Sequence, residues 1–159
     1  MRLTPEEVIE KYKNRLFSIA FNICQNPTDA DDIVQDTFIK YFTLKKEFDN
    51  EAHIKAWLIR VTINRSKDVS TSFWRKNKVA WEDYMETLVF EEPGDGRLFE
   101  AVMKLPEKYR IVIHLFYYED YSVREIAELL KRRENTVKSQ LARGRMFLKD
   151  MLKEEWDDE

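Results

Sequence analysis

Cysteine, histidine, glycine and proline are all scarce in this chain of 159 residues. Cys24 is the only cysteine, which excludes a disulfide within the chain, and with just His53 and His114 beside it no spacing suits a structural zinc site. Three glycines and four prolines leave few places for the tight turns that sheet-rich folds need. These absences favour a helical fold held together by an apolar core.

Long apolar runs are missing as well. No stretch approaches the roughly 20 apolar residues that a membrane-spanning helix needs, and residues 1–10 are too polar for a cleavable secretory signal. We therefore expect a cytoplasmic protein with no membrane insertion.

Charge is abundant and nearly balanced, with 27 basic and 30 acidic residues and a net charge of −3. Residues 1–78 carry 14 basic and 11 acidic side chains, and residues 97–155 carry 13 and 10, so both segments have an excess of positive charge. The surplus acid lies elsewhere: residues 80–96 hold six carboxylates and no basic side chain, and residues 157–159 add three more. The two long segments therefore have the electrostatic balance that nucleic-acid binding requires.

Apolar periodicity in the first half predicts four helical segments, the last long helix counting as two because β-branched and small residues at 69–72 can interrupt it. One apolar face is formed by residues recurring at steps of three and four, namely Val8, Tyr12, Leu16, Ile19 and Ile23. This first helix should end near Asn26-Pro27, and the next should begin with Thr28 as its N-cap and run to Leu44. A long third helix is predicted from about Ala52 to Arg75.

The second half predicts four more helices, over Leu98–Leu105, Pro106–Tyr118, Ser122–Lys131 and Glu134–Leu152. The fold class is therefore all-α, with two small helical domains. We assign residues 1–78 to the first domain, 79–96 to a flexible acidic linker, 97–155 to the second domain and 156–159 to an acidic tail.

The stretch Tyr121–Leu148 is predicted to be a helix-turn-helix. Ser122 and Glu125 have the spacing of a capping box, which fixes the start of the first helix, and the turn falls at residues 131–133. In the second helix Val137, Leu141 and Leu148 share one face. The opposite face has the chemistry of a DNA groove reader: Asn135, Lys138, Ser139, Ala142 and Arg143.

This stretch also resembles a known family. Residues 121–130 (YSVREIAELL) and 136–145 (TVKSQLARGR) are similar to region 4.2 of extracytoplasmic-function (group 4) sigma factors of the sigma-70 family, and residues 105–110 (LPEKYR) to region 4.1. The chain departs from the family pattern at Lys131, Arg133, Asn135 and Gln140, with Lys131 where a turn glycine is common. The resemblance implies that the major groove of the −35 element is bound by Arg133, Glu134, Asn135, Thr136, Lys138, Ser139, Gln140, Ala142 and Arg143.

The first domain resembles the same family. Residues 29–38 (DADDIVQDTF) are similar to region 2.2, which docks on the clamp helices of the polymerase β′ subunit. The periodicity agrees, because Val34, Phe38 and Phe42 form an apolar stripe beside a mixed polar face. The residues expected to bind core polymerase are Asp29, Asp32, Ile33, Gln35, Asp36 and Ile39.

Residues 57–64 (WLIRVTIN) resemble region 2.3, which helps to melt the −10 element, and the loop around residues 48–50 resembles the family's pocket for a flipped base. On a helical wheel Trp57 lies off the apolar stripe, beside cations, where an aromatic ring could stack on a single-stranded base. Pattern alone equally allows Trp57 to pack under the loop at residues 45–51. The residues expected to contact the −10 strand are Phe48, Asp49, Asn50, Trp57, Arg60, Asn64, Lys67 and Arg75.

The resemblance as a whole implies a sigma factor that binds core RNA polymerase through the β′ clamp helices and the β flap, recognises promoter DNA, and is held by an anti-sigma factor. We expect no enzymatic activity, no cofactor and no metal. One alternative is a stand-alone helix-turn-helix regulator, which leaves residues 29–38 and 57–64 unexplained. A metal-dependent hydrolase built on the carboxylates of residues 29–36 lacks histidine partners and a phosphate-binding glycine loop.

Overall fold

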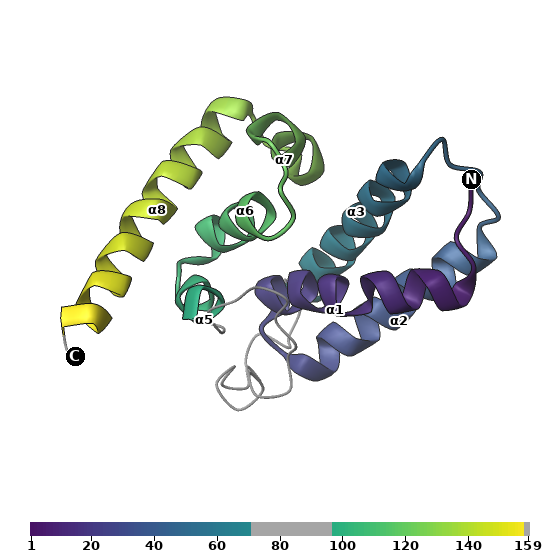
Figure 1. Ribbon diagram of the computed structural model, residues 1–159, viewed down its shortest axis with the longest axis horizontal. Helices are drawn as coiled ribbons and strands as arrows, with labels where there is room; N and C mark the ends of the chain where they lie inside the picture. The colour runs from purple at the N-terminus through teal and green to yellow at the C-terminus, as the bar shows by residue number, and fades with distance from the viewer. Residues whose placement is uncertain (71–96, 158–159) are drawn as a thin grey trace. The chain divides into compact units, whose positions relative to one another are not determined.

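The computed structural model describes residues 1–70 and 97–157, and every regular element within these ranges is an α-helix. The chain divides into two compact units, Met1–Tyr84 and Met85–Glu159, which we call unit 1 and unit 2 (Figure 1). The all-α fold class is therefore confirmed. The predicted linker, residues 79–96, lies outside the described residues. None of the described helices has the length and apolarity needed to cross a membrane.

The described part of unit 1, residues 1–70, contains three long helices, α1 (Pro5–Cys24), α2 (Pro27–Thr43) and α3 (Glu51–Ser70), each of which packs against the other two. The apolar face predicted for α1 is confirmed, because all five of its residues are buried. Cys24 is buried at the end of this helix. The core of unit 1 is therefore the space enclosed by three amphipathic faces.

The N-termini of α1 and α2 are both capped by side chains. Thr4 and Glu7 form a capping box at α1, which the sequence analysis missed. At α2 the predicted N-cap, Thr28, is wrong: Asn26 caps the helix, its side chain accepting a hydrogen bond of 3.0 Å from the backbone of Asp29. Pro27 explains the shift, since proline is favoured at the first position of a helix and disfavours a cap further along.

Unit 2 consists of α5 (Arg97–Met103), α6 (Glu107–Tyr117), α7 (Val123–Leu130) and α8 (Glu134–Asp157). All four were predicted within a few residues, but α8 continues beyond Leu152 to Asp157, into the stretch expected to be an acidic tail. Helix α8 packs against α5, α6 and α7. It is therefore the central support of unit 2 as well as its longest helix.

His114 lies fully inside unit 2, with only 1% of its surface exposed. Its ring stacks on Tyr118 at a centroid distance of 4.9 Å and meets the edge of Phe99 at 6.1 Å. In the part of the chain that the structure describes, neither ring nitrogen has a hydrogen-bond partner. Burial lowers the pKa of His114 from 6.5 to about 4, although the nearby Glu119 carboxylate acts in the opposite direction.

We predict that unit 2 loses stability as the pH falls from about 6.5 to about 4. Over this range the unfolded chain binds a proton at His114 that the folded chain does not, which costs about 3 kcal/mol when the shift is fully expressed. Denaturant unfolding at several pH values, with hydrogen exchange at the α6 amides to localise the effect, measures it. His114→Leu, which cannot titrate, should have a flatter pH dependence; identical slopes for the two proteins would contradict the prediction.

Candidate nucleic-acid and partner interfaces

The helix-turn-helix in unit 2 is held by local backbone geometry. Ser122 and Glu125 form the predicted capping box: the Glu125 N–H donates to the Ser122 hydroxyl at 3.1 Å, and the Ser122 N–H donates to the Glu125 carboxylate at 3.0 Å. Lys131 ends α7 in the left-handed conformation, with φ 56° and ψ 47°. Glycine adopts this conformation without strain, so Lys131 makes the turn at a cost of about 1 kcal/mol.

Helix α8 has the two faces that the sequence predicts. Val137, Leu141 and Leu148 are buried, with 0–5% of their surfaces exposed. The predicted groove-reading residues are all exposed: Arg133, Glu134, Asn135, Thr136, Lys138, Ser139, Ala142 and Arg143. Gln140 differs, because it is half-buried. The first turns of α8 therefore present a continuous polar surface, with Gln140 at its inner edge.

Arg132 supports this polar surface through hydrogen bonds, a role that the sequence analysis did not predict. Its guanidinium donates to the Gln140 side-chain oxygen at 2.8 Å and to the backbone carbonyl of Lys108 at 3.2 Å, which joins the turn to α6 and α8. Burial lowers the pKa of Arg132, and the Glu107 carboxylate opposes this. The residue stays cationic and acts as a support for Gln140.

Tyr109 links the polar surface to α6 in a second place. Burial alone would raise the pKa of Tyr109, but hydrogen bonds from Arg143 and Lys108 to its phenol lower the pKa overall. The Tyr109 ring also lies 5.6 Å from the ring of Phe147 on α8. The exposed Arg143 side chain therefore lies near Tyr109 of α6.

Gly144 sets the distance between α6 and α8. It is buried, and a Cβ at this position would lie 2.8 Å from Cγ1 and 2.9 Å from Cδ1 of Ile113. Real Cβ atoms do not approach so closely, so the crossing requires a residue without a side chain. Gly144 was read only as part of a family motif, whereas its structural role depends on Ile113, 31 residues earlier.

In unit 1 two residues predicted to contact single-stranded DNA are in the core. Phe48 is 3% exposed and Trp57 is 8% exposed, and their rings meet edge to face at 5.9 Å. Tyr41 stacks on Phe48 at 5.9 Å and lies 6.1 Å from Trp57. The placement of Trp57 off the core was wrong, and the alternative, packing under the loop at residues 45–51, is correct. These three residues form what we call the aromatic cluster.

The other residues predicted at the −10 face have different environments. Asp49, Asn50, Arg60 and Asn64 are exposed, Lys67 is half-buried, and Arg75 lies outside the described residues. Asn50 also caps α3, since its side-chain oxygen accepts from the His53 N–H at 2.9 Å. The Asn50 side chain therefore has a structural function whatever else it binds.

Of the six residues predicted on the partner face of α2, four are exposed, one is half-buried and one is buried. Asp32, Gln35, Asp36 and Ile39 lie at the surface, and Ile39 is 57% exposed. Asp29 is half-buried; burial, and secondly the Asp32 charge, raise its pKa. Ile33 was predicted on this face but is 1% exposed, because the core of unit 1 takes that side of the helix.

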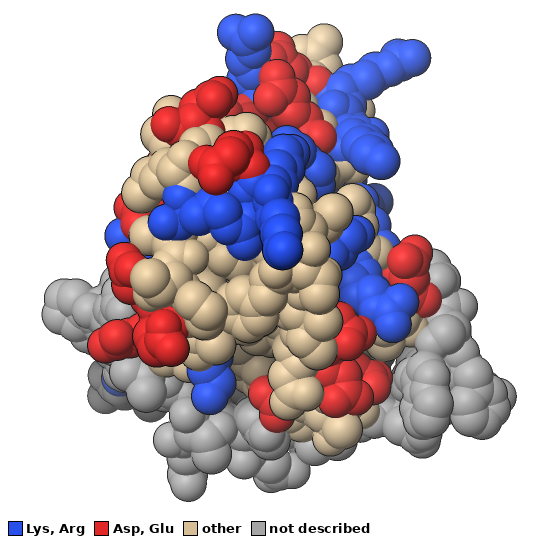
Figure 2. Space-filling view, turned by 90° about the vertical axis from the view of Figure 1, so that its right-hand side faces the viewer, with Lys and Arg blue, Asp and Glu red and all other residues tan. Residues whose placement is uncertain are grey.

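Charge is mixed on the face of the molecule that Figure 2 shows. On the face in Figure 2, lysine and arginine side chains lie among aspartate and glutamate side chains, and no single sign covers the surface. Asp36 on α2 and Arg65 on α3 form one such pair, at 3.5 Å. Among the described residues no group of histidine, cysteine and acidic side chains could hold a metal ion. Because charge is mixed on this face, a nucleic-acid contact there would use local sets of cations.

Comparisons with known proteins give the same result for both units. Residues 8–79 match the family described as Sigma-70 region 2, and residues 95–148 match Sigma-70, region 4. The RNA polymerase sigma factor SigV of Bacillus subtilis is 31% identical over 153 residues, covering 92% of this chain and 90% of the relative. The ECF RNA polymerase sigma factor SigW of the same species is 28% identical over 166 residues, covering 93% and 88%.

Solved structures share the fold. The sigma factor RpoE, crystallised with the anti-sigma factor NepR from Bartonella quintana, has a TM-score of 0.70 and 22% identity, covering 93% of this chain and 96% of that one. CnrH, in complex with the cytosolic domain of CnrY, has a TM-score of 0.65 and 25% identity, covering 94% and 87%.

We predict that Gly144→Ala destabilises unit 2 by about 1–3 kcal/mol, the usual cost of overpacking, even though alanine is the better helix former. Denaturant unfolding of the full chain measures the change. The control is the same substitution in an Ile113→Ala background, which removes both clashing atoms. There Gly144→Ala should be neutral or stabilising, and an equal loss in both backgrounds would contradict the assigned contact.

Proposed function

This chain belongs to the extracytoplasmic-function group of the sigma-70 family of RNA polymerase sigma factors, and we propose that it directs core RNA polymerase to specific promoters. One observation carries the proposal: a single chain pairs a helix-turn-helix that has an exposed polar reading face with a helical unit that has an exposed acidic and apolar face on α2. A stand-alone regulator would need the first feature alone.

Unit 2 reads the −35 element as duplex DNA. The N-terminal turns of α8 enter the major groove, where Lys138 and Arg143 bind guanine edges or phosphates and Asn135 and Ser139 bind bases or backbone. Ala142 permits close approach to a thymine methyl group. Arg132 and Gly144 support this face from behind, and Gln140 contributes from its edge.

Unit 1 binds the −10 element as a single strand. The exposed polar side chains Asp49, Asn50, Arg60 and Asn64, with Lys67 and Arg75, contact bases and phosphates. Phe48 and Trp57 act indirectly in this scheme, because their rings are buried in the aromatic cluster. They hold the loop at residues 44–50 in place instead of stacking on an extruded base.

The α2 face docks on the clamp helices of the polymerase β′ subunit. Asp32, Gln35 and Asp36 provide polar contacts. Ile39 provides an apolar contact, and removing its exposed surface from water would stabilise the complex. Unit 2 docks on the β flap. The protein works in the cytoplasm and acts by binding, without a catalytic step of its own.

An anti-sigma factor completes the scheme. Among the solved structures with this fold, RpoE is bound to the anti-sigma factor NepR, and CnrH is bound to the cytosolic domain of CnrY. We propose that a partner of this kind covers the polymerase- and promoter-binding faces of this chain until it is released.

Reconstitution with core RNA polymerase tests the function. We expect transcripts from a defined subset of genomic fragments, absent with core polymerase alone. Fragments that yield transcripts should share a −35 and a −10 element. If no fragment is transcribed and the chain alone binds duplex DNA tightly, the regulator is the correct function instead.

We predict that Lys138→Ala combined with Arg143→Ala abolishes −35 selectivity while leaving core binding intact. Each good base contact supplies about 1–3 kcal/mol of discrimination, so a loss of at least about tenfold is expected. Transcription from paired templates with intact and scrambled −35 elements, together with core-binding titration, measures both properties.

The matched control is Lys149→Ala with Lys153→Ala, which removes the same charge from exposed positions further along α8. It should retain the selectivity. If the Lys138/Arg143 variant instead loses core binding, the assignment of DNA reading to this face of unit 2 is wrong.

A further inference from the structure

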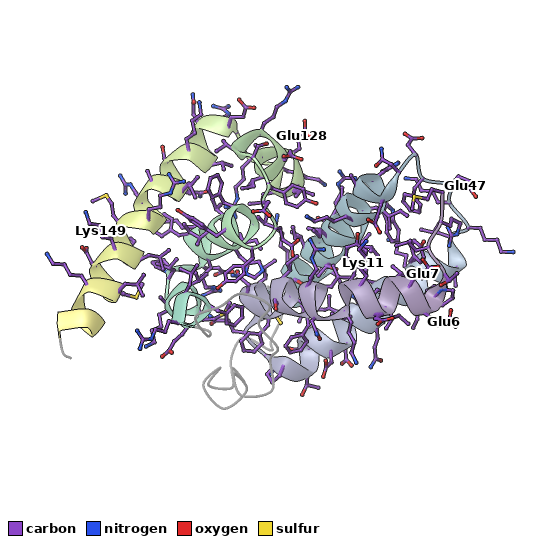
Figure 3. The ribbon with its side chains drawn as sticks, viewed as in Figure 1. Glu6, Glu7, Lys11, Glu47, Glu128 and Lys149 are labelled. Atoms are coloured by element: carbon purple, nitrogen blue, oxygen red, sulfur yellow. The ribbon has the colours of Figure 1, made fainter. Side chains whose placement is uncertain are left out.

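The segment between α2 and α3, residues 44–50, is short, and all of its residues are exposed except Phe48. Phe48 enters the aromatic cluster, and Asp49, directly after it, has a side chain that is 94% exposed. We call residues 44–50 the specificity loop. Figure 3 shows Glu47 of this loop at the end of unit 1 where α1 begins with Glu6 and Glu7. The first residues of the chain therefore lie beside the loop.

Arg2 binds two backbone carbonyls, one in the last turn of α2 and one within the loop. Its Nη1 donates to the carbonyl of Lys46 at 2.6 Å, and its Nη2 donates to the carbonyl of Tyr41 at 2.9 Å. The guanidinium carbon also lies 4.6 Å from the centre of the Tyr41 ring. One planar cation thus joins the last turn of α2, the loop and the aromatic cluster.

The chemistry at this position suits arginine. The Tyr41 carbonyl is in the last turn of α2, where carbonyls lack partners within the helix and the helix dipole favours a positive charge. Beyond it, Lys45 has a positive φ of 27°, so the chain leaves the helix in a conformation that non-glycine residues disfavour. The planar guanidinium presents a rigid fork of N–H donors to both carbonyls, whereas a lysine ammonium would have to reach them as a compact charge on a flexible stem.

Neighbouring backbone contacts fix the same arrangement. The Leu3 N–H donates to the Tyr41 hydroxyl at 2.9 Å, and that hydroxyl donates to the Leu3 carbonyl at 3.1 Å. The Phe48 N–H donates to the Met1 carbonyl at 3.2 Å. Residues 1–3 therefore lie along the loop and hold Phe48 at its base.

We infer that Arg2 is a positioning residue for −10 recognition: by fixing the backbone at Tyr41 and Lys46, it sets the position from which Asp49 and its neighbours read the base. The inference rests on the proposed function, since it assumes that the specificity loop contacts the −10 strand. Arg2 itself needs no contact with DNA.

The test compares base preference at each −10 position for the reconstituted holoenzyme. Asp49→Ala identifies the positions that the specificity loop reads. Arg2→Ala should lose about tenfold discrimination at those positions and little elsewhere, within the range of one base contact. The double variant should lose no more than the larger single effect, because both substitutions act on one contact. Arg2→Lys should restore the discrimination in part.

Lys13→Ala is the matched control, since it removes one exposed positive charge from α1 without touching the loop. Uniform loss across all −10 sequences, with a weaker salt dependence, would mean that Arg2 binds phosphate directly and would overturn the inference. So would unchanged base preference, or a loss of thermal stability without a change in preference. If the wild-type holoenzyme gives no promoter-specific transcript, the proposed function fails first.

Discussion

In the described residues, each unit forms its hydrophobic core from only three or four helices. The small volume of this core determines where most of the large apolar side chains lie. Small domains bury a smaller fraction of their surface than large ones, so their stability depends on using each aromatic ring. In unit 1 Tyr12, Tyr41, Phe48 and Trp57 are all buried. The surface is therefore left mainly to polar side chains, with a few exposed apolar residues such as Ile39 among them.

The same constraint changes how the first unit would read DNA. An aromatic residue near a nucleic-acid face suggests stacking on a base, but Trp57 and Phe48 pack against each other and against Tyr41. Their contribution is rigidity, because a recognition loop anchored in a core keeps its polar groups within a narrow range of positions. Asp49 follows Phe48 directly in the chain. The packing that folds unit 1 would therefore also fix the position of the Asp49 side chain, which we propose reads the base.

A structural feature could be predicted from the sequence only where the residues that produce it lie close together in the chain. The capping box at Ser122 and the buried face of α8 follow from residues within one or two turns, and both were confirmed. Thr28 was predicted as the cap of α2, but Asn26 is an equally good N-cap, and the proline between the two residues decides in its favour. Trp57 was misplaced because a helical wheel describes one helix, whereas burial in unit 1 depends on which faces of two other helices close over it.

The supports of both reading surfaces escaped prediction for the same reason. Arg132 binds a carbonyl 24 residues away, and Arg2 binds carbonyls 39 and 44 residues away, so neither contact leaves a pattern in the local sequence. Both are cations that an electrostatic count would assign to DNA. Their guanidinium groups instead satisfy backbone carbonyls, one at the helix-turn-helix and one at the specificity loop. Some of the positive charge of each domain is thus used in internal hydrogen bonds to backbone carbonyls. Net charge alone therefore overstates the number of cations available to bind DNA.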